Sequence, residues 1–203
     1  MKYLSIALLL LALVVLSACD IKLRSTINLS DVFSSANKMV ISDLMIDVSS
    51  CTEENIQKAV SGIEQNGVKA KYKSCKNEGM DSYAVFSMPL VIVKDGNEAP
   101  NKGDFYLSFK HDKLYIHTSD RMGGLLSTEE GKLKIGEINF ELINDTEENI
   151  KLNVQSVFLD GQPVLSKIVD VAPYENVSIR LSDVTRKILE RSNVALPVVK
   201  FVE

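Results

Sequence analysis

The sequence predicts an α+β protein, in which an N-terminal antiparallel-rich sheet with one helix is followed by a small immunoglobulin-like β-sandwich. Three observations support this fold class: one helical pattern between two strand patterns in the first half, short alternating strands in the second half, and a polar, glycine-containing segment between the halves. We therefore expect an α+β domain over residues 38–120, a connector over 121–132 and a β-rich domain over 133–203.

The chain opens with the layout of a secretory signal. Lys2 is the only charge before Asp20, residues 4–16 are apolar apart from one serine, and small residues lead into Cys19. The apolar stretch is shorter than the roughly 20 residues that a membrane-spanning helix needs. We expect residues 1–18 to be a signal peptide. The alternatives are an ordinary, non-lipoprotein signal and a buried helix with an incidental cysteine.

The run Leu16-Ser17-Ala18-Cys19 resembles the lipobox of bacterial lipoproteins. The resemblance implies that Cys19 is lipidated with acyl chains such as palmitate, becomes the first mature residue and anchors the chain to a membrane. In a two-membrane cell, it implies that Asp20 retains the protein in the inner membrane, facing the periplasm; the alternative is an outer-membrane lipoprotein. Residues 19–37 would form the lipidated N-terminus and tether.

The expected mature chain is mildly acidic. The full chain has 23 Lys and Arg against 27 Asp and Glu, so the loss of Lys2 leaves a net charge of about −5. This balance argues against nucleic acid as a partner, because phosphates need a basic face. It also argues against a polybasic lipid-binding surface.

One clear helix is expected after residue 51. A strand pattern over 38–48 leads into a capping box formed by Ser50 and Glu53. One apolar face follows with helical spacing, made of Ile56, Ala59, Val60 and Ile63. Gly67 suits the end of this helix, and residues 68–75 form a returning strand.

The matched lengths of helix and strand predict a disulfide between Cys51 and Cys75. The helix runs about 24 Å at 1.5 Å per residue, and the strand returns about 27 Å at 3.3 Å per residue. Cys75 should therefore lie level with Cys51, and an exported chain meets oxidising conditions. The alternative is a reactive Cys51 thiolate at the helix N-terminus.

Further strand patterns complete both halves. Pro89 interrupts a strand over 83–93, which predicts an edge or a bulge. A β-hairpin is expected over residues 105–118. The second half predicts four strands, over residues 138–142, 150–158, 164–171 and 176–181. A helix over 183–191 and an edge strand over 194–202 follow.

Leu-Ser-Asp-Val occurs twice, at residues 29–32 and 181–184. We expect each copy to mark a strand that leads into a capped helical turn. A functional repeat is the alternative.

Residues with catalytic or metal-binding chemistry are sparse. The chain has no G-x-S-x-G, H-E-x-x-H or Walker A motif. His111 and His117 are the only histidines, and we expect both to be exposed polar residues rather than metal ligands. Three pairs of carboxylates are expected to be solvated: Glu53-Glu54, Glu129-Glu130 and Glu147-Glu148. We predict no catalytic residue, no metal, no cofactor and no enzyme activity.

The lipobox, the early Leu-Ser-Asp-Val, the mid-chain cysteine pair and the segment 160–163 together resemble small lipoproteins of phages and prophages. Some of these block infection by a second phage, so the resemblance implies a possible role in superinfection exclusion. We predict a membrane-anchored, non-catalytic binding or interaction module with a protein partner in the cell envelope. The alternative is an envelope hydrolase or small-ligand-binding protein whose site forms only in three dimensions, in a deep pocket lined by Asp, Ser or His.

Overall fold

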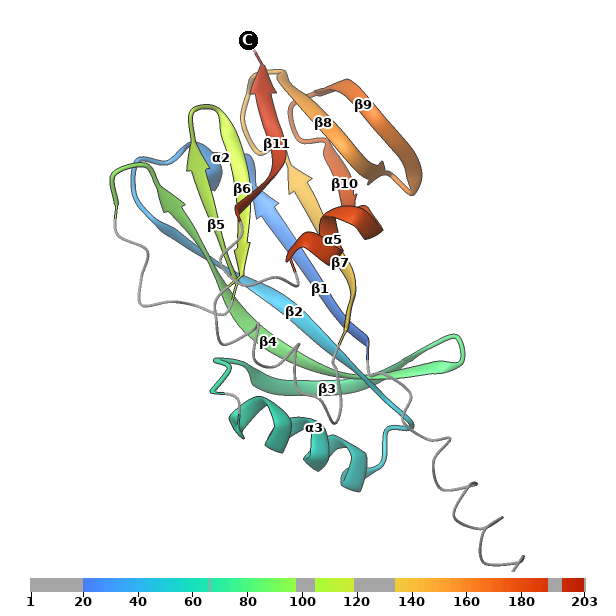
Figure 1. Ribbon diagram of the computed structural model, residues 1–203. Helices are drawn as coiled ribbons and strands as arrows, with labels where there is room; N and C mark the ends of the chain where they lie inside the picture. The colour runs from blue at the N-terminus through green and yellow to red at the C-terminus, as the bar shows by residue number, and fades with distance from the viewer. Residues whose placement is uncertain (1–19, 66, 98–104, 119–133, 190–194, 203) are drawn as a thin grey trace, which may run out of the picture.

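The computed structural model describes residues 20–65, 67–97, 105–118, 134–189 and 195–202 (Figure 1). Strands make up 63% of the described residues, and the described helices are short. The described helices are α2 (Leu29–Phe33), α3 (Glu53–Gln65) and α5 (Asp183–Leu189). The strands are β1 (Asp20–Asn28), β2 (Lys38–Val48), β3 (Lys71–Glu78), β4 (Asp81–Lys94), β5 (Phe105–Lys110), β6 (Lys113–Thr118), β7 (Lys134–Ile143), β8 (Ile150–Leu159), β9 (Gln162–Val171), β10 (Asn176–Leu181) and β11 (Ala195–Val202).

Nine of these strands close into a β-barrel, in the order β10-β7-β1-β2-β4-β5-β6-β11-β8, and β8 returns to β10. The predicted fold class is therefore wrong: the chain forms neither an immunoglobulin-like sandwich nor a separate N-terminal sheet. The alternating patterns did identify strands with one buried face. They carry no information on which strand pairs with which, and here strands from the two halves of the chain pair with each other.

The strand β1 joins the two halves of the chain. It pairs with β2 in antiparallel fashion on one edge and with β7 in parallel fashion on the other. Ile21, Leu23 and Ile27 are fully buried, and Ser25 is buried with them, whereas Lys22, Arg24 and Thr26 between them face outward. The segment expected as a tether thus contains a barrel strand, followed by α2. The whole of the predicted connector, 121–132, lies outside the described residues.

Two strands with three partners each shape the barrel. The strand β4 pairs with β2 along one edge, and with β3 and then β5 along the other. On the edge shared by β3 and β5, Pro89 lies in the gap between Ser87, which pairs with β3, and Val91, which pairs with β5. The strand β8 pairs with β9 along one edge, and with β11 and then β10 along the other; Ser156, with φ +54°, lies at this change of partner.

The interior of the barrel is filled by apolar side chains. Phe86, Phe105 and Phe140 are at most 1% exposed and belong to one continuous core cluster. Two polar groups inside this wall satisfy each other, since the Ser42 hydroxyl donates to the Ser25 hydroxyl over 2.9 Å. Any ligand of the described structure would therefore bind on the outside of the barrel.

The helix α3 lies beneath β3 and β2 (Figure 1) and is joined to β3 by the predicted disulfide, Cys51–Cys75, with 5.7 Å between the Cα atoms. The helix begins one residue after Thr52, whose hydroxyl accepts from the Asn55 amide, so Thr52 rather than Ser50 acts as the cap. At its other end the Val68 amide donates to the Ile63 carbonyl around Gly67, which has φ +65°.

Loss of the disulfide should destabilise the protein. Closure of a loop with a sequence separation of 24 contributes about 3.5 kcal/mol in the chain-entropy model. We expect Cys51→Ala and Cys75→Ala each to lower the free energy of unfolding by roughly this amount, and the double variant to be little worse, because one shared bond is lost in all three. Urea unfolding measures these values. Additive losses, or two thiols that alkylate freely without a reductant, would contradict the bridge.

Candidate functional site

The outer face of β1 carries an ionic cluster that we call the clamp: Lys22 and Arg24 with Glu78 at the end of β3. The Arg24 guanidinium donates to both Glu78 carboxylate oxygens, over 2.8 and 3.2 Å, and Lys22 Nζ lies 3.6 Å from the same carboxylate. Arg24 also lies 3.5 Å from Glu137 on β7. The clamp therefore ties β3 to β1 across the two intervening strands, β2 and β4.

The pKa of Glu78 reflects its contacts with these cations. Hydrogen bonds from Arg24, and then from Lys76, outweigh the effect of burial and lower the pKa of Glu78 to about 2. A carboxylate with such a pKa stays ionised at physiological pH, so it cannot act as a general acid there and is only a weak general base. The clamp is thus suited to holding strands together and unsuited to catalysis.

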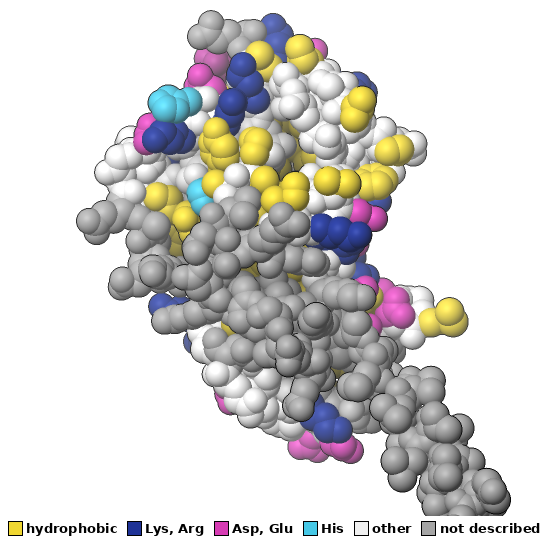
Figure 2. All heavy atoms as spheres, viewed as in Figure 1, with side chains coloured by type: hydrophobic (Ala, Val, Ile, Leu, Met, Phe, Trp, Pro, Cys, Tyr) yellow, Lys and Arg dark blue, Asp and Glu magenta, His cyan; other side chains and the backbone are white. Residues whose placement is uncertain are grey.

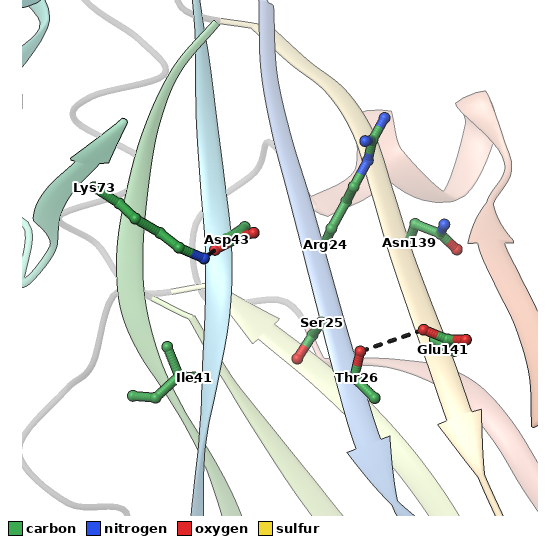
Figure 3. Close-up of a pocket in the computed structure, with 8 residues that line it drawn as sticks. All are labelled: Arg24, Ser25, Thr26, Ile41, Asp43, Lys73, Asn139 and Glu141. Atoms are coloured by element: carbon green, nitrogen blue, oxygen red, sulfur yellow. Dashed lines mark hydrogen bonds and ion pairs between the residues drawn. The ribbon is translucent and has the colours of Figure 1, made fainter. Parts of the chain in front are cut away.

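A shallow polar groove of about 290 Å³ lies beside the clamp. Figure 3 shows the residues that line it: Arg24, Ser25, Thr26, Ile41, Asp43, Lys73, Asn139 and Glu141. Lys73 reaches from β3 to Asp43 over 3.0 Å, and the Thr26 hydroxyl donates to Glu141 over 3.3 Å. Because each charged side chain in this groove already has a partner within the protein, the groove offers little free charge to a ligand.

A second groove, of about 270 Å³, lies at the end of the barrel where β1 finishes. We call it the distal groove. It is lined by Phe33, Glu148, Asn149, Ile150, Lys151, Phe201 and Val202. The Phe33 ring is 42% exposed and makes edge contacts with Phe201 and Phe109, at 5.0 and 5.9 Å between ring centroids. Exposed aromatic side chains with a charged rim are typical of binding anchors.

The short helix α2, which carries Phe33, is held at both ends. At its start, the Asp145 carboxylate accepts from the Ser30 amide over 2.8 Å and from the Ser30 hydroxyl. At its other end, the Lys94 ammonium donates to the Asp31 carbonyl over 2.8 Å and to the Val32 carbonyl. Burial lowers the pKa of Lys94 to about 8. These contacts fix the position of Phe33.

A serine and a histidine meet on the outer face of β5 and β6. The Ser108 hydroxyl and His117 Nε2 are 2.7 Å apart, and the His117 ring stacks on Tyr106 with 4.3 Å between centroids. Burial lowers the pKa of His117. Among the contacts of the described residues, none joins a carboxylate to His117. The pair is therefore a serine–histidine contact without a described third group to orient the imidazole.

Apolar side chains are exposed elsewhere too. Figure 2 shows several of them across the upper half of one face, among Lys, Arg, Asp and Glu. Leu165 and Ile168 on β9 are 84% and 58% exposed. No three His, Cys, Asp or Glu side chains of the described ranges cluster as a metal site would require, and none of the helices described is long and apolar enough to cross a membrane.

One comparison with known proteins identifies the family. Residues 21–202 match the family described as "Domain of unknown function (DUF7424)". The chain belongs to this family. No curated protein and no solved structure matches the chain. Nothing in the DUF7424 match indicates a catalytic activity.

The residues singled out in the sequence lie apart in this DUF7424 domain. Cys19 is outside the described residues, and Asp20 is exposed as the first residue of β1. His111 lies in the turn between β5 and β6, with φ +47°, away from the Ser108 contact of His117. Glu53-Glu54 lie in the first turn of α3 and Glu147-Glu148 in the loop before β8, whereas Glu129-Glu130 are outside the described ranges.

Sequence reasoning missed the clamp, the distal groove and Lys94. Arg24 and Glu78 are 54 residues apart, and neither stands in a recognisable motif. The two copies of Leu-Ser-Asp-Val did predict helical turns correctly, since β1 leads into α2 and β10 leads into α5. Only the second copy has the expected cap, since Ser182 accepts from the Thr185 amide. The first helical turn has no side-chain cap of its own, and its Ser30 amide donates to Asp145 instead.

The clamp predicts an acid-sensitive contribution to stability. The folded pKa of Glu78, about 2, lies below the ordinary value of 4.5, so its stabilisation is present above pH 4.5 and is lost as the pH falls towards 2. Glu78→Gln should lower the free energy of unfolding at pH 7 by roughly 1–2 kcal/mol, because solvent screens a partly exposed ion pair. The difference from wild type should shrink in acid. Denaturant unfolding at pH 7 and at pH 3 measures both values.

Glu54→Gln, in an exposed pair with Lys58, is the matched control and should change little. If both variants lower the free energy of unfolding equally, the clamp stabilises the protein no more than an exposed ion pair does.

Proposed function

We propose that this DUF7424 protein is a membrane-anchored lipoprotein that binds a protein partner at the cell envelope without catalysing a reaction. The anchor is Cys19, which directly precedes the first barrel strand. The family match begins at residue 21, so the shared domain begins where the signal segment would be removed. This agreement supports processing at Cys19.

The observation that carries the proposal is the placement of the distal groove relative to the anchor. The nine residues of β1 span about 30 Å at 3.3 Å per residue, from Asp20 at one end to Asn28 at the other. The helix α2 and Phe33 follow at the far end. A lipid on Cys19 would therefore hold the distal groove away from the membrane, where a protein of the same compartment can reach it.

The chemistry of the distal groove favours a protein partner. Phe33 and Phe201 form an apolar contact surface in the groove. Lys151 and Glu148 at its rim can pair with charges of either sign. We expect the partner to place an apolar or aromatic side chain against Phe33. The contacts of Asp145 and Lys94 fix α2 in place. Such binding is favoured, because Phe33 would lose little conformational freedom when a partner binds.

The residues at the expected anchor also bear on which membrane holds the protein. We propose the inner membrane, facing the periplasm, because Asp20 follows Cys19; the alternative is the outer membrane. A role in phage exclusion stays a prediction from the resemblance to phage lipoproteins. A hydrolase has only the Ser108–His117 contact in its favour, on an open face.

Lipidation should depend on Cys19. The thiolate is the group that accepts diacylglycerol, so Cys19→Ser should leave an uncleaved precursor without acyl chains. Mass spectrometry of the purified protein measures the acyl mass. Asp20→Ser is the matched variant: it should still be acylated, but in a two-membrane cell it should move to the outer-membrane fraction. Wild-type protein without acyl chains would refute the anchor, and wild type found mainly in outer membranes would refute the role of Asp20.

Binding should occur through the distal groove. A photo-crosslinking amino acid at position 33, in the full chain and in its own membrane, should form one discrete adduct with an envelope protein. Position 174 is the matched control, because Tyr174 is 73% exposed but does not line the distal groove. Lys151→Glu should weaken the adduct at position 33 by reversing a rim charge. The proposal fails if positions 33 and 174 give the same adducts, or if position 33 gives none.

A further inference from the structure

We propose that the turn between β3 and β4, with Met80 at its tip, inserts into the lipid surface beside the Cys19 anchor. This inference rests on the proposed function, because it needs a lipid on Cys19. Met80 is 102% exposed, the highest value among the exposed large hydrophobic residues of the described structure. Gly79 beside it has φ +66°, which lets the chain reverse sharply and present Met80 at the tip.

No linker separates the anchor from the barrel. In the sequence Cys19 directly precedes Asp20, the first residue of β1, so a lipid on Cys19 would be attached one residue before the barrel. Asp20, although exposed, lies directly beside Gly136 of β7: a side-chain carbon added at Gly136 would lie 3.0 Å from the Asp20 Cβ. The Gly136 carbonyl in turn accepts from the Arg186 guanidinium. The start of β1 is therefore fixed, and the barrel end that carries it must lie against the bilayer.

Strand register places Met80 beyond that end. The strand β4 runs in the same direction as β1, because both are antiparallel to β2. Across β2, Ile21 is level with Ala84. Asp20 is therefore level with Tyr83, and Met80 lies three residues further along, about 10 Å at 3.3 Å per residue. Figure 1 shows this turn projecting from the barrel on the side where β1 begins. A projection of about 10 Å matches the depth of the interface between headgroups and acyl chains.

The clamp fixes this turn relative to the anchor. Glu78 is two residues from Met80, and its carboxylate is bound by Lys22 and Arg24 of β1. On the other strand, the Tyr83 hydroxyl donates to Asp81 over 3.4 Å, and Lys22 Nζ lies 4.1 Å from the centre of the Tyr83 ring. The turn and the start of β1 thus move as one body.

The charges around the turn define the lipid. Carboxylates and cations both lie beside the turn. Burial, and then the charges of Asp81 and Asp20, raise the pKa of Asp47, whereas the charge of Lys22 lowers it. Lys76 and Arg24 bind Glu78. Such a mixed surface favours neither a purely anionic nor a purely cationic headgroup. We therefore assign a zwitterionic phospholipid surface as the ligand, with the Met80 thioether and methyl group among the upper acyl carbons.

The absence of tryptophan from the chain allows a direct test. Met80→Trp introduces a single tryptophan at the turn, and Tyr174→Trp introduces one at the far end of the barrel as the matched control. Each full-length, lipidated protein is placed in phosphatidylcholine vesicles, with or without brominated acyl chains. We expect brominated lipid to reduce the fluorescence of Trp at position 80 by roughly twofold or more, because this residue reaches the acyl region. The fluorescence of Trp at position 174 should not change, because this residue does not reach the acyl chains. Glu78→Gln in the Met80→Trp background should reduce this quenching.

The outcomes separate the inference from the proposed function. Acyl mass on Cys19 and flotation with vesicles test the anchor independently of the fluorescence. An anchored protein whose Trp at position 80 is unquenched overturns the inference and leaves the anchor intact. That result would favour a protein partner, rather than lipid, as the ligand of the turn. A protein without acyl mass overturns both. Equal quenching at positions 80 and 174 also overturns the inference, because the barrel then has no fixed orientation.

Discussion

The parallel pairing of β1 with β7 is the constraint on which the rest of the structure depends. It runs from Asp20 to Asn28 on one strand and from Lys134 to Ile143 on the other. Without it, the strands before and after residues 119–133 would share no edge at this point, and the ring could not close. The inward side chains of β1 also lie at the centre of the core, where Ile21, Leu23 and Ile27 are fully buried. A strand with two partners and a buried face is the least replaceable part of a barrel.

The sequence predicted elements better than partners. The strands over 38–48 and 176–181 have the predicted bounds, and the Cys51–Cys75 bridge follows from lengths along one local stretch of chain. These successes depend on residues close in sequence. The barrel was missed because ring closure depends on pairs far apart in sequence, such as Leu23 with Ile138, which periodicity cannot reveal.

The strand β1 shows a different kind of error. Its alternation of Ile21, Leu23 and Ile27 with polar residues is a clear strand pattern. It was assigned to a tether because the neighbouring lipobox implied one. Of the candidate site, Phe33, Lys94 and Asp145 could not be foreseen, since the contacts that bring them together join three separate loops and strands. A helix of five residues such as α2 has no stability of its own, so its place is set entirely by those contacts.

Ring closure leaves two strands of the described sheet with a free edge, β3 and β9. An open strand edge presents unpaired N–H and C=O groups, to which a strand of a neighbouring copy could add. Lysines lie along both edges: Lys71, Lys73 and Lys76 on β3, and Lys167 on β9. Lys73 and Lys76 pair with Asp43 and Glu78, which neutralise part of their charge. Long charged side chains along both edges still disfavour the addition of a strand from another copy, so the two open edges are protected without being covered.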